Sequence, residues 1–266
     1  MIVDIVLIVL GVRYGFASET CFTAQVAHTD TTRYGWYYRP RTDGLQPERN
    51  TEMQFAYDLG AYSVGDSDEK IIYLTFDAGY DNGYASDILD TLAAHDAPAA
   101  FFLVAHYIEA NPDITRRMAE EGHLVCNHTA HHKDMAALTD FDAFAKELCG
   151  LEDTCMAVTG QPMAKYFRPP SGTFSERCIR YANELGYTTV FWSFAYRDWV
   201  VDDQPSESAA IDVIMARTHP GEIALLHLTS ETNARVLDTV LTKWEDMGYR
   251  LESLDYLVDT CDSSGE

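Results

Sequence analysis

The sequence has few basic residues. Only 19 of its 266 residues are Lys or Arg, against 42 Asp or Glu, so the formal net charge is −23 at pH 7. A chain this acidic is unsuited to nucleic acid or an anionic membrane surface as a main partner. Its charge suits a neutral or cationic substrate or a divalent metal, although solubility alone is the simpler explanation.

The sequence also lacks paired cysteines. None of its six cysteines forms a CxxC pair, which disfavours a zinc finger or a thioredoxin-like redox protein. Cys126 lies in an apolar run and is expected to be an ordinary buried thiol. There is no internal repeat and no low-complexity segment, and 47% of the residues are hydrophobic. The chain can therefore bury a sizeable core.

Residues 1–20 begin with an apolar run, MIVDIVLIVLG, that is too short to cross a bilayer as a regular helix. Its length suits the core of a signal peptide, but Asp4 and the absence of an early Lys or Arg are atypical of one. Two explanations stay open: an export signal or membrane-proximal segment, or an apolar stretch of a protein whose start lies upstream. The first would place the protein outside the cytoplasm.

From Lys70 onward, short β-type runs alternate with helical stretches. Strands are expected at 71–76, 99–104, 123–126, 166–168, 188–193, 222–227 and 249–251, and helices at 84–95, 112–121, 140–158, 175–185, 209–217 and 233–247. About seven β-then-α units predict an α/β fold with a parallel sheet and right-handed crossovers. The count favours a distorted (β/α) barrel over an open sheet. Residues 66–262 would form this domain, with residues 21–65 as an irregular aromatic arm packed on it.

Polar side chains gather at the ends of these predicted strands. They fall at or just after the carboxyl ends, where α/β folds place their chemistry: Asp77, His128, His132, Arg168, Asp198 and His227. Each alone has an ordinary explanation, such as a helix cap for Asp77 or a satisfied core residue for His227. Chance would scatter such residues to both ends of the strands, so their shared position indicates a site.

The spacing of two histidines suggests a metal site. His128 and His132 are four residues apart, so a helical turn would put both imidazoles on one face. Two neutral imidazoles are a good half of a divalent-metal site. Arg168 ends a strand before two prolines, where its guanidinium could hold a carboxylate in a bidentate pair.

Five short motifs resemble, in order, those of the polysaccharide deacetylases (NodB homology, carbohydrate esterase family four). They are TFDAG at 75–79, HTAHH at 128–132, RPPSG at 168–172, DW at 198–199 and LLH at 225–227. Within that family the chain looks closest to the delta-lactam-biosynthetic peptidoglycan deacetylases of spore formers. The cues are TFDAGYDNGY, FRPPSGTFSE, VFWSFAYRDW, LLHLTSETNA and the aromatic arm around Trp36–Tyr38.

The resemblance implies a distorted barrel and the metal-assisted removal of acetyl groups from N-acetyl sugars, here the N-acetylmuramic acid of peptidoglycan. It makes Asp77 the general base and His227 the general acid. The remaining roles it implies are orientation of that pair by Arg168 and Asp198, a divalent metal (zinc) on His128 and His132, and substrate contacts by Trp199, Tyr80 and Phe174.

Two positions depart from the family pattern. Ala78 stands where relatives carry a second aspartate that binds the metal, and a methyl group cannot coordinate a cation. The metal is therefore expected to be weakly held, with Asp81 as an alternative ligand. The lactam-type enzymes that the chain resembles also lack this aspartate. Lys133 replaces a proline after the second metal histidine, which we interpret as a tolerated loop change.

Other functions remain open at this point. One is deacetylation of a different glycan, of chitin type or O-acetylated xylan. Another is a carbohydrate-binding protein with a decayed site, which Ala78 would suit but the intact Asp77, Asp198 and His227 argue against. The expected partner is the glycan strand of peptidoglycan, on the cell-wall side of the membrane, with no nucleic acid, no stable protein partner and a monomeric state.

Overall fold

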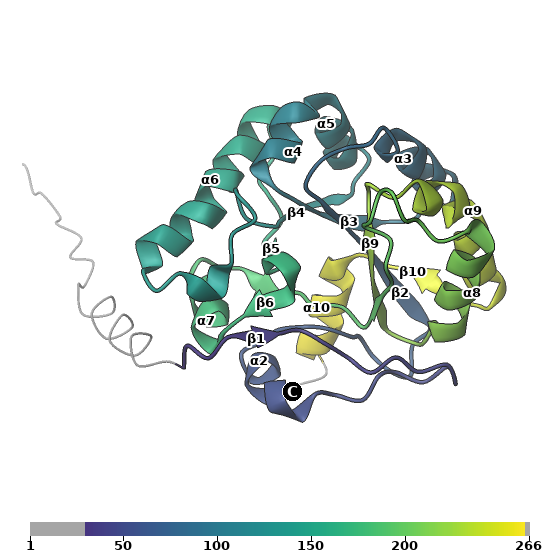
Figure 1. Ribbon diagram of the computed structural model, residues 1–266, viewed down its shortest axis with the longest axis horizontal. Helices are drawn as coiled ribbons and strands as arrows, with labels where there is room; N and C mark the ends of the chain where they lie inside the picture. The colour runs from purple at the N-terminus through teal and green to yellow at the C-terminus, as the bar shows by residue number, and fades with distance from the viewer. Residues whose placement is uncertain (1–29, 264–266) are drawn as a thin grey trace, which may run out of the picture.

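The computed structural model describes residues 30–263, with side chains described to residue 260, and its centre is one parallel sheet. The order of the strands is β7-β5-β4-β3-β2-β9-β8, with β10 pairing with β2, and all of these pairings are parallel (Figure 1). The strands are β2 (Ile71–Ala78), β3 (Ala99–Leu103), β4 (Leu124–Asn127), β5 (Tyr166–Phe167), β7 (Thr188–Thr189), β8 (Phe194–Ala195), β9 (Glu222–His227) and β10 (Arg250–Leu251). The predicted parallel α/β fold is confirmed.

The sheet curls into a half-barrel. Its two end strands in the order, β7 and β8, are separated in sequence only by residues 190–193. Tyr62 forms a parallel bridge with Val190, and Val64 an antiparallel bridge with Glu222. The chain between the end strands, with residues 62–64, therefore draws the two edges together, which matches the expected distorted barrel.

Helices cover the outside of the curled sheet (Figure 1). Six of them begin and end within two residues of the predicted positions: α3 (Ala85–Ala94), α5 (Pro112–Glu120), α6 (Phe141–Thr159), α7 (Glu176–Glu184), α8 (Glu207–Arg217) and α9 (Glu231–Asp246). Side chains of Asp140, Ser175, Ser206 and Ser230 accept hydrogen bonds at the first turns of α6, α7, α8 and α9, which explains where these helices begin. The sequence did not predict α2 (Gln54–Asp58), α4 (Ala105–Ala110) or α10 (Leu254–Ser263).

Strand β2 separates two layers of core. All eight of its residues are buried, and alternate side chains face opposite sides of a strand. Ile72, Leu74, Phe76 and Ala78 join the cluster that includes residues of α3 and α9. Ile71 and Tyr73 join a second cluster with Phe102 and Cys126. Asp77 is on the same face as Ile71 and Tyr73, so its carboxylate projects to the inner side of the half-barrel.

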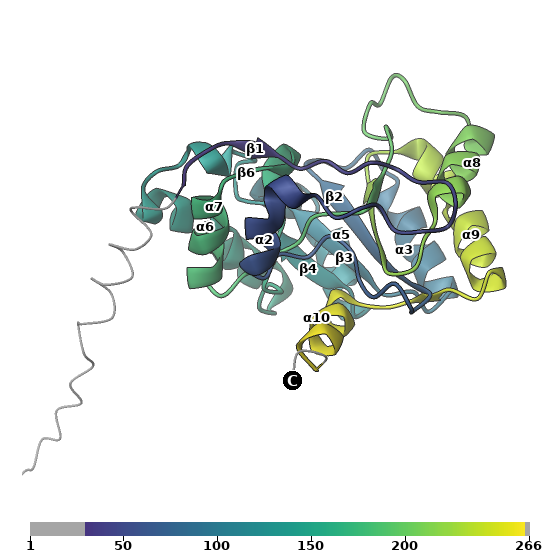
Figure 2. The same cartoon turned by 90° about the horizontal axis from the view of Figure 1, so that it is seen from below.

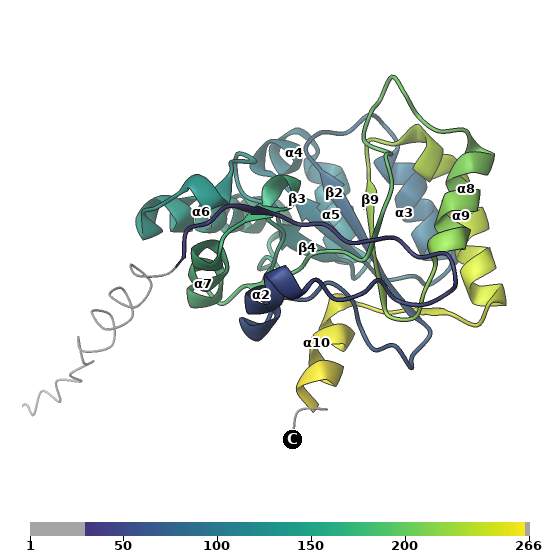
Figure 3. The same cartoon turned by 60° about the horizontal axis from the view of Figure 1, so that its bottom comes forward.

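The described part of the arm crosses the open side of the half-barrel (Figures 2 and 3). Its strand β1 (Tyr34–Gly35) pairs antiparallel with β6 (Thr173–Phe174). The Trp36 ring stacks on Phe191 with centroids 4.3 Å apart, and its Nε1–H donates to the Trp192 carbonyl. The expected packing of the arm on the domain is thus observed, while the boundary at residue 65 stays a prediction.

The expected signal or membrane-proximal segment, residues 1–20, lies outside the described residues, as do residues 21–29. Between residues 30 and 263, no helix combines the length and the apolar character that crossing a membrane requires. The remaining short elements are the 3-10 turns η1 (Thr51–Met53), η2 (Met135–Ala137) and η3 (Pro170–Gly172).

The turn before β9 depends on a glycine. Gly221 has φ +67°, and a Cβ there would lie 2.6 Å from the Gly65 carbonyl carbon. We predict that Gly221→Ala lowers the free energy of unfolding by roughly 1–3 kcal/mol from overpacking, added to about 1–2 kcal/mol for the left-handed backbone. Gly122→Ala is the control, since its φ is +84° but no atom lies within 4 Å of the added Cβ. Equal losses in urea denaturation would contradict the close approach.

Candidate active site

A buried ion pair lies at the carboxyl end of β2. The Arg168 Nη1 atom is 2.7 Å from Asp77 Oδ1, and the Arg168 side chain is fully buried. Its Nε and Nη2 donate to the carbonyls of Val190 and Phe191 at 3.1 and 3.2 Å, and the guanidinium lies 4.1 Å from the centroid of the Phe102 ring. Arg168 therefore holds the Asp77 carboxylate as expected, but through one contact and not a bidentate pair.

The surroundings of Asp77 keep it ionised. Burial favours the neutral acid, but the charge of Arg168 and the nearby imidazoles of His128 and His227 outweigh it and lower the pKa of Asp77. Because Arg168 occupies Oδ1, the second oxygen, Oδ2, remains to accept a proton from water. Asp77 is thus a carboxylate in position to act as a base.

His128 and His132 lie side by side, but not on a helical turn. Strand β4 ends at Asn127, and the chain then turns with φ of 70° at Thr129 and 54° at His132. The prediction of a helical turn was therefore wrong. The two rings still meet edge to face, with centroids 5.0 Å apart, because left-handed residues fold the loop back on itself.

His128 presents a free nitrogen toward Asp77. Its Nδ1 lies 2.8 Å from the Arg168 carbonyl, which only accepts, so Nδ1 carries the hydrogen. Nε2 then has the lone pair and lies 3.6 Å from Asp77 Oδ2. Burial lowers the pKa of His128 to about 4, so the ring is neutral at neutral pH, as a metal ligand must be.

The donors near this loop suit a metal held by two imidazoles. Ala78 is buried in the apolar core, and Asp81 is not among the residues that line the pocket described below. Within the described part of the chain, no three His, Cys, Asp or Glu side chains converge as a metal site. The free His128 nitrogen and the adjacent His132 ring are donors of the kind that a divalent metal takes, and a metal on this pair stays a prediction.

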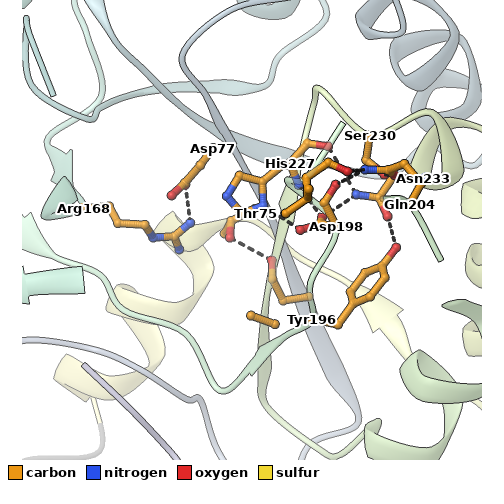
Figure 4. A network of polar contacts seen from close by, with 12 residues as sticks. Thr75, Asp77, Arg168, Tyr196, Asp198, Gln204, His227, Ser230 and Asn233 are labelled. Atoms are coloured by element: carbon orange, nitrogen blue, oxygen red, sulfur yellow. Dashed lines mark hydrogen bonds and ion pairs between the residues drawn. The ribbon is translucent and has the colours of Figure 1, made fainter. Parts of the chain in front are cut away.

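On the other side of Asp77, His227 is backed by a buried carboxylate (Figure 4). His227 is the register partner of Asp77 across β2 and β9. Asp198, which is fully buried, lies 2.8 Å from His227 Nδ1 through Oδ1 and accepts the His227 backbone N–H at 2.8 Å through Oδ2. Burial opposes the imidazolium, but the hydrogen bond and charge of Asp198 outweigh it and raise the pKa of His227.

Two asparagines that the sequence did not single out hold these histidines. Asn233 Nδ2 donates to Asp198 Oδ2 at 2.6 Å, and its Oδ1 accepts from the Tyr196 hydroxyl. Asn127 Oδ1 accepts the Thr129 N–H at 2.9 Å, which fixes the turn after His128. Both residues lie beside catalytic motifs, in the stretches CNHTAHH and HLTSETNA. This position was the one feature of the sequence that could have indicated their role.

Asp77, His128, His132 and His227 all line one pocket of about 690 Å³. Trp199 also lines it, half exposed, with its ring centroid 5.7 Å from that of His227. The other two expected substrate contacts are not found there. Phe174 is fully buried and packs on Phe191 at 4.7 Å. Tyr80 is exposed on the loop after β2 but is not among the lining residues.

The pocket thus holds a carboxylate that can take a proton and a carboxylate-backed imidazole that can give one. Water cleaves an amide or an ester with the help of such a pair, so fold and site together define a hydrolase built on a parallel half-barrel. The chain belongs to the polysaccharide deacetylase family, carbohydrate esterase family 4. The family model for polysaccharide deacetylase matches residues 64–190.

Relatives extend this match over most of the chain. Peptidoglycan-N-acetylmuramic acid deacetylase PdaA of Bacillus subtilis is 35% identical over 236 residues, 88% of this chain and 89% of PdaA. The solved structure of B. subtilis PdaA, a family 4 carbohydrate esterase, superposes with a TM-score of 0.84 at 34% identity, covering 87% of this chain and 99% of that one. A chitooligosaccharide deacetylase of Rhizobium leguminosarum bv. trifolii is 35% identical over 60% of this chain and 73% of its own length. The expected family and fold are confirmed.

The raised pKa of His227 predicts a specific pH dependence. An imidazole with a raised pKa stays protonated to higher pH, so loss of the acid sets the basic limb of the pH–rate profile. Asp198→Asn removes the charge that raises this pKa, and we expect it to move the basic limb to lower pH. If the basic limb stays in place in Asp198→Asn, Asp198 does not raise the pKa of His227.

Loss of the imidazole itself should depend on the leaving group. We expect His227→Ala to lower the rate of amide cleavage roughly 10²–10⁴-fold, whereas an activated ester, whose leaving group needs no proton, is cleaved nearly normally. Rates on the two substrates are compared in one preparation. If both fall equally, His227 is not the general acid.

Proposed function

We propose that the protein removes the N-acetyl group from N-acetylmuramic acid residues of peptidoglycan, as in the formation of muramic delta-lactam. The observation that carries the proposal is the pairing of Asp77 and His227, a carboxylate of lowered pKa and an imidazole of raised pKa on neighbouring strands of one pocket. Similarity to PdaA along most of both chains supports the substrate. Such a substrate places the enzyme on the cell-wall side of the membrane.

The proposed reaction uses four groups, which are Asp77, Arg168, Ser171 and His227. Asp77 takes a proton from water through Oδ2 while Arg168 holds Oδ1, and the water oxygen adds to the acetamide carbonyl. We assign stabilisation of the resulting oxyanion to a backbone N–H of the loop after Arg168, and favour that of Ser171 because this residue lines the pocket. The prolines at 169 and 170 have no N–H, and that of Gly172 already donates to the Pro169 carbonyl at 3.0 Å. Backbone donors of this kind stabilise the developing charge.

His227 completes the cleavage. Its Nδ1 is bonded to Asp198, so Nε2 delivers the proton to the nitrogen of the sugar as the C–N bond breaks. The products are acetate and a free amino sugar. A divalent metal, for which we favour zinc, would be held by His128 and His132 and would supply Lewis-acid polarisation of water and carbonyl. Trp199 offers an exposed ring on which an apolar sugar face can stack.

Basic residues in the pocket support a substrate that carries an anionic group. Arg217 lines the pocket and lies near the Tyr38 hydroxyl, and within residues 30–260 its guanidinium has no carboxylate partner. Arg197 also lines the pocket and pairs with Asp203 at 2.6 Å. In a chain of net charge −23, a half-buried arginine without an acidic partner suits the lactyl carboxylate of N-acetylmuramic acid. A chitin-type sugar has no such group.

The function is tested by acetate release. Purified protein is incubated with peptidoglycan fragments, chitooligosaccharides and acetylated xylan, with zinc or with a chelator, and acetate is measured by mass spectrometry. We expect release from peptidoglycan, and a loss of roughly 10²–10⁴-fold in Asp77→Asn, whose amide still accepts from Arg168. Near-wild-type turnover in folded Asp77→Asn would rule out the base. Absence of acetate from every substrate would instead favour a carbohydrate-binding protein.

Arg217 is predicted to select for the carboxylate. We expect Arg217→Gln to raise KM about tenfold, a loss of about 1.4 kcal/mol, on fragments with a free lactyl carboxylate, and to leave KM unchanged on fragments with that carboxyl reduced to an alcohol. Lys146→Gln on α6 changes the net charge equally but lies outside the pocket. Equal effects of Arg217→Gln on both substrates would show that Arg217 does not recognise the lactyl carboxylate.

A further inference from the structure

One buried carboxylate holds the loop that carries His132. Glu147, on α6, has only 2% of its surface exposed. Its side chain accepts the backbone N–H of His131 at 3.0 Å and lies 3.1 Å from His131 Nδ1 and 2.7 Å from Lys133 Nζ. Its backbone carbonyl accepts the N–H of Ala130 at 2.9 Å. Glu147 thus contacts the residues immediately before and after His132 and the one two positions before it.

The contacts of Glu147 hold the backbone of the loop at residues 130–133. A carboxylate taken out of water is unfavourable unless charged and hydrogen-bonding partners surround it, and the polar partners found for this side chain belong to residues 131 and 133. The same loop contains two non-glycine residues with positive φ, Thr129 and His132. Such conformations persist where surrounding contacts impose them. The bonds to Glu147 therefore impose the left-handed turn at His132.

His128 is fixed by a different set of contacts. Its ring bonds to the Arg168 carbonyl, and its backbone N–H donates to the Leu103 carbonyl at 3.0 Å. Asn127 holds the following N–H, that of Thr129. Glu147 touches none of these groups. The segments that carry the two imidazoles, whose rings are 5.0 Å apart, are consequently held separately, that of His128 by the sheet and that of His132 by α6.

We propose that Glu147 is the positioning residue that sets His132 against His128 and so determines how well the pair binds a divalent metal. The proposal rests on the proposed function, because it assigns the metal to these two rings. Lys133 contributes to this positioning, because its ammonium compensates the charge of the buried Glu147 carboxylate. This gives a physical role to the lysine at a position where a proline was the expected residue.

The test compares four variants in the full chain. Glu147→Ala removes all side-chain acceptors, Glu147→Gln keeps one oxygen for the His131 N–H, and Lys133→Met removes only the cation. Asp153→Asn is the control on the same helix, because Asp153 is exposed and takes part in none of the hydrogen bonds and ion pairs found for the loop. Zinc affinity is measured by calorimetry, and the imidazole signals of His128 and His132 by ¹H–¹⁵N NMR without metal.

We expect Glu147→Ala to weaken zinc binding at least tenfold and to shift the His132 ring signals while those of His128 stay in place. Glu147→Gln should recover part of the affinity, Lys133→Met should fall between Glu147→Gln and wild type, and Asp153→Asn should match wild type. Unchanged His132 signals in folded Glu147→Ala, or an equal loss of affinity in Asp153→Asn, would overturn the proposal. Neither result depends on acetate release, so failure of the proposed function is recognised separately, by wild-type protein that releases no acetate.

Discussion

The structure of the site depends on the buried ion pair between Arg168 and Asp77. A fully buried guanidinium is unfavourable in isolation, and removal of one partner of such a pair costs roughly 3–5 kcal/mol because it strands the other charge. Arg168 avoids this by bonding to Asp77 and to the carbonyls of Val190 and Phe191. Its own carbonyl fixes the ring of His128. One residue therefore joins β2, the segment that draws the sheet edges together, and the histidine loop.

Parallel pairing then decides what the ion pair faces. Asp77 and His227 are register partners on β2 and β9. Strand pairing alone therefore brings the base and the acid together at the carboxyl ends of these two strands, without any contribution from loop geometry. Their pKa values are moved in opposite directions by different partners, downward for Asp77 by Arg168 and upward for His227 by Asp198. At neutral pH this leaves the base ionised and favours the protonated acid, which is the state that amide cleavage requires.

The sequence predicted the parts of the molecule that obey a regular period. The buried run of β2 and the six helices were placed to within two residues, because apolar periodicity and capping side chains mark them. The two-residue strands β1, β6 and β8 carry no such period, so Phe174 was expected to contact the substrate although it packs on Phe191 beneath the arm. The prediction of a helical turn at His128–His132 was wrong for a related reason. The spacing of the two histidines cannot reveal the positive φ at Thr129 and His132. These backbone angles depend on contacts with Asn127, in the preceding strand, and with Glu147, on α6.

The position of Ala78 leaves Asp77 as the one residue of the Asp77–Ala78 pair that faces the site. Alternation along β2 puts Asp77 on the inner face and Ala78 in the outer core with Val104 and Ala130. The negative charge of Asp77 is already compensated by Arg168, and burial keeps His128 neutral. A cation near His128 and His132 therefore meets the neutral His128 ring and, 3.6 Å from His128 Nε2, an Asp77 carboxylate whose charge Arg168 already compensates, which limits the electrostatic part of its binding. Proton transfer by Asp77 and His227 rests instead on Arg168 and Asp198, whose contacts are complete within the protein.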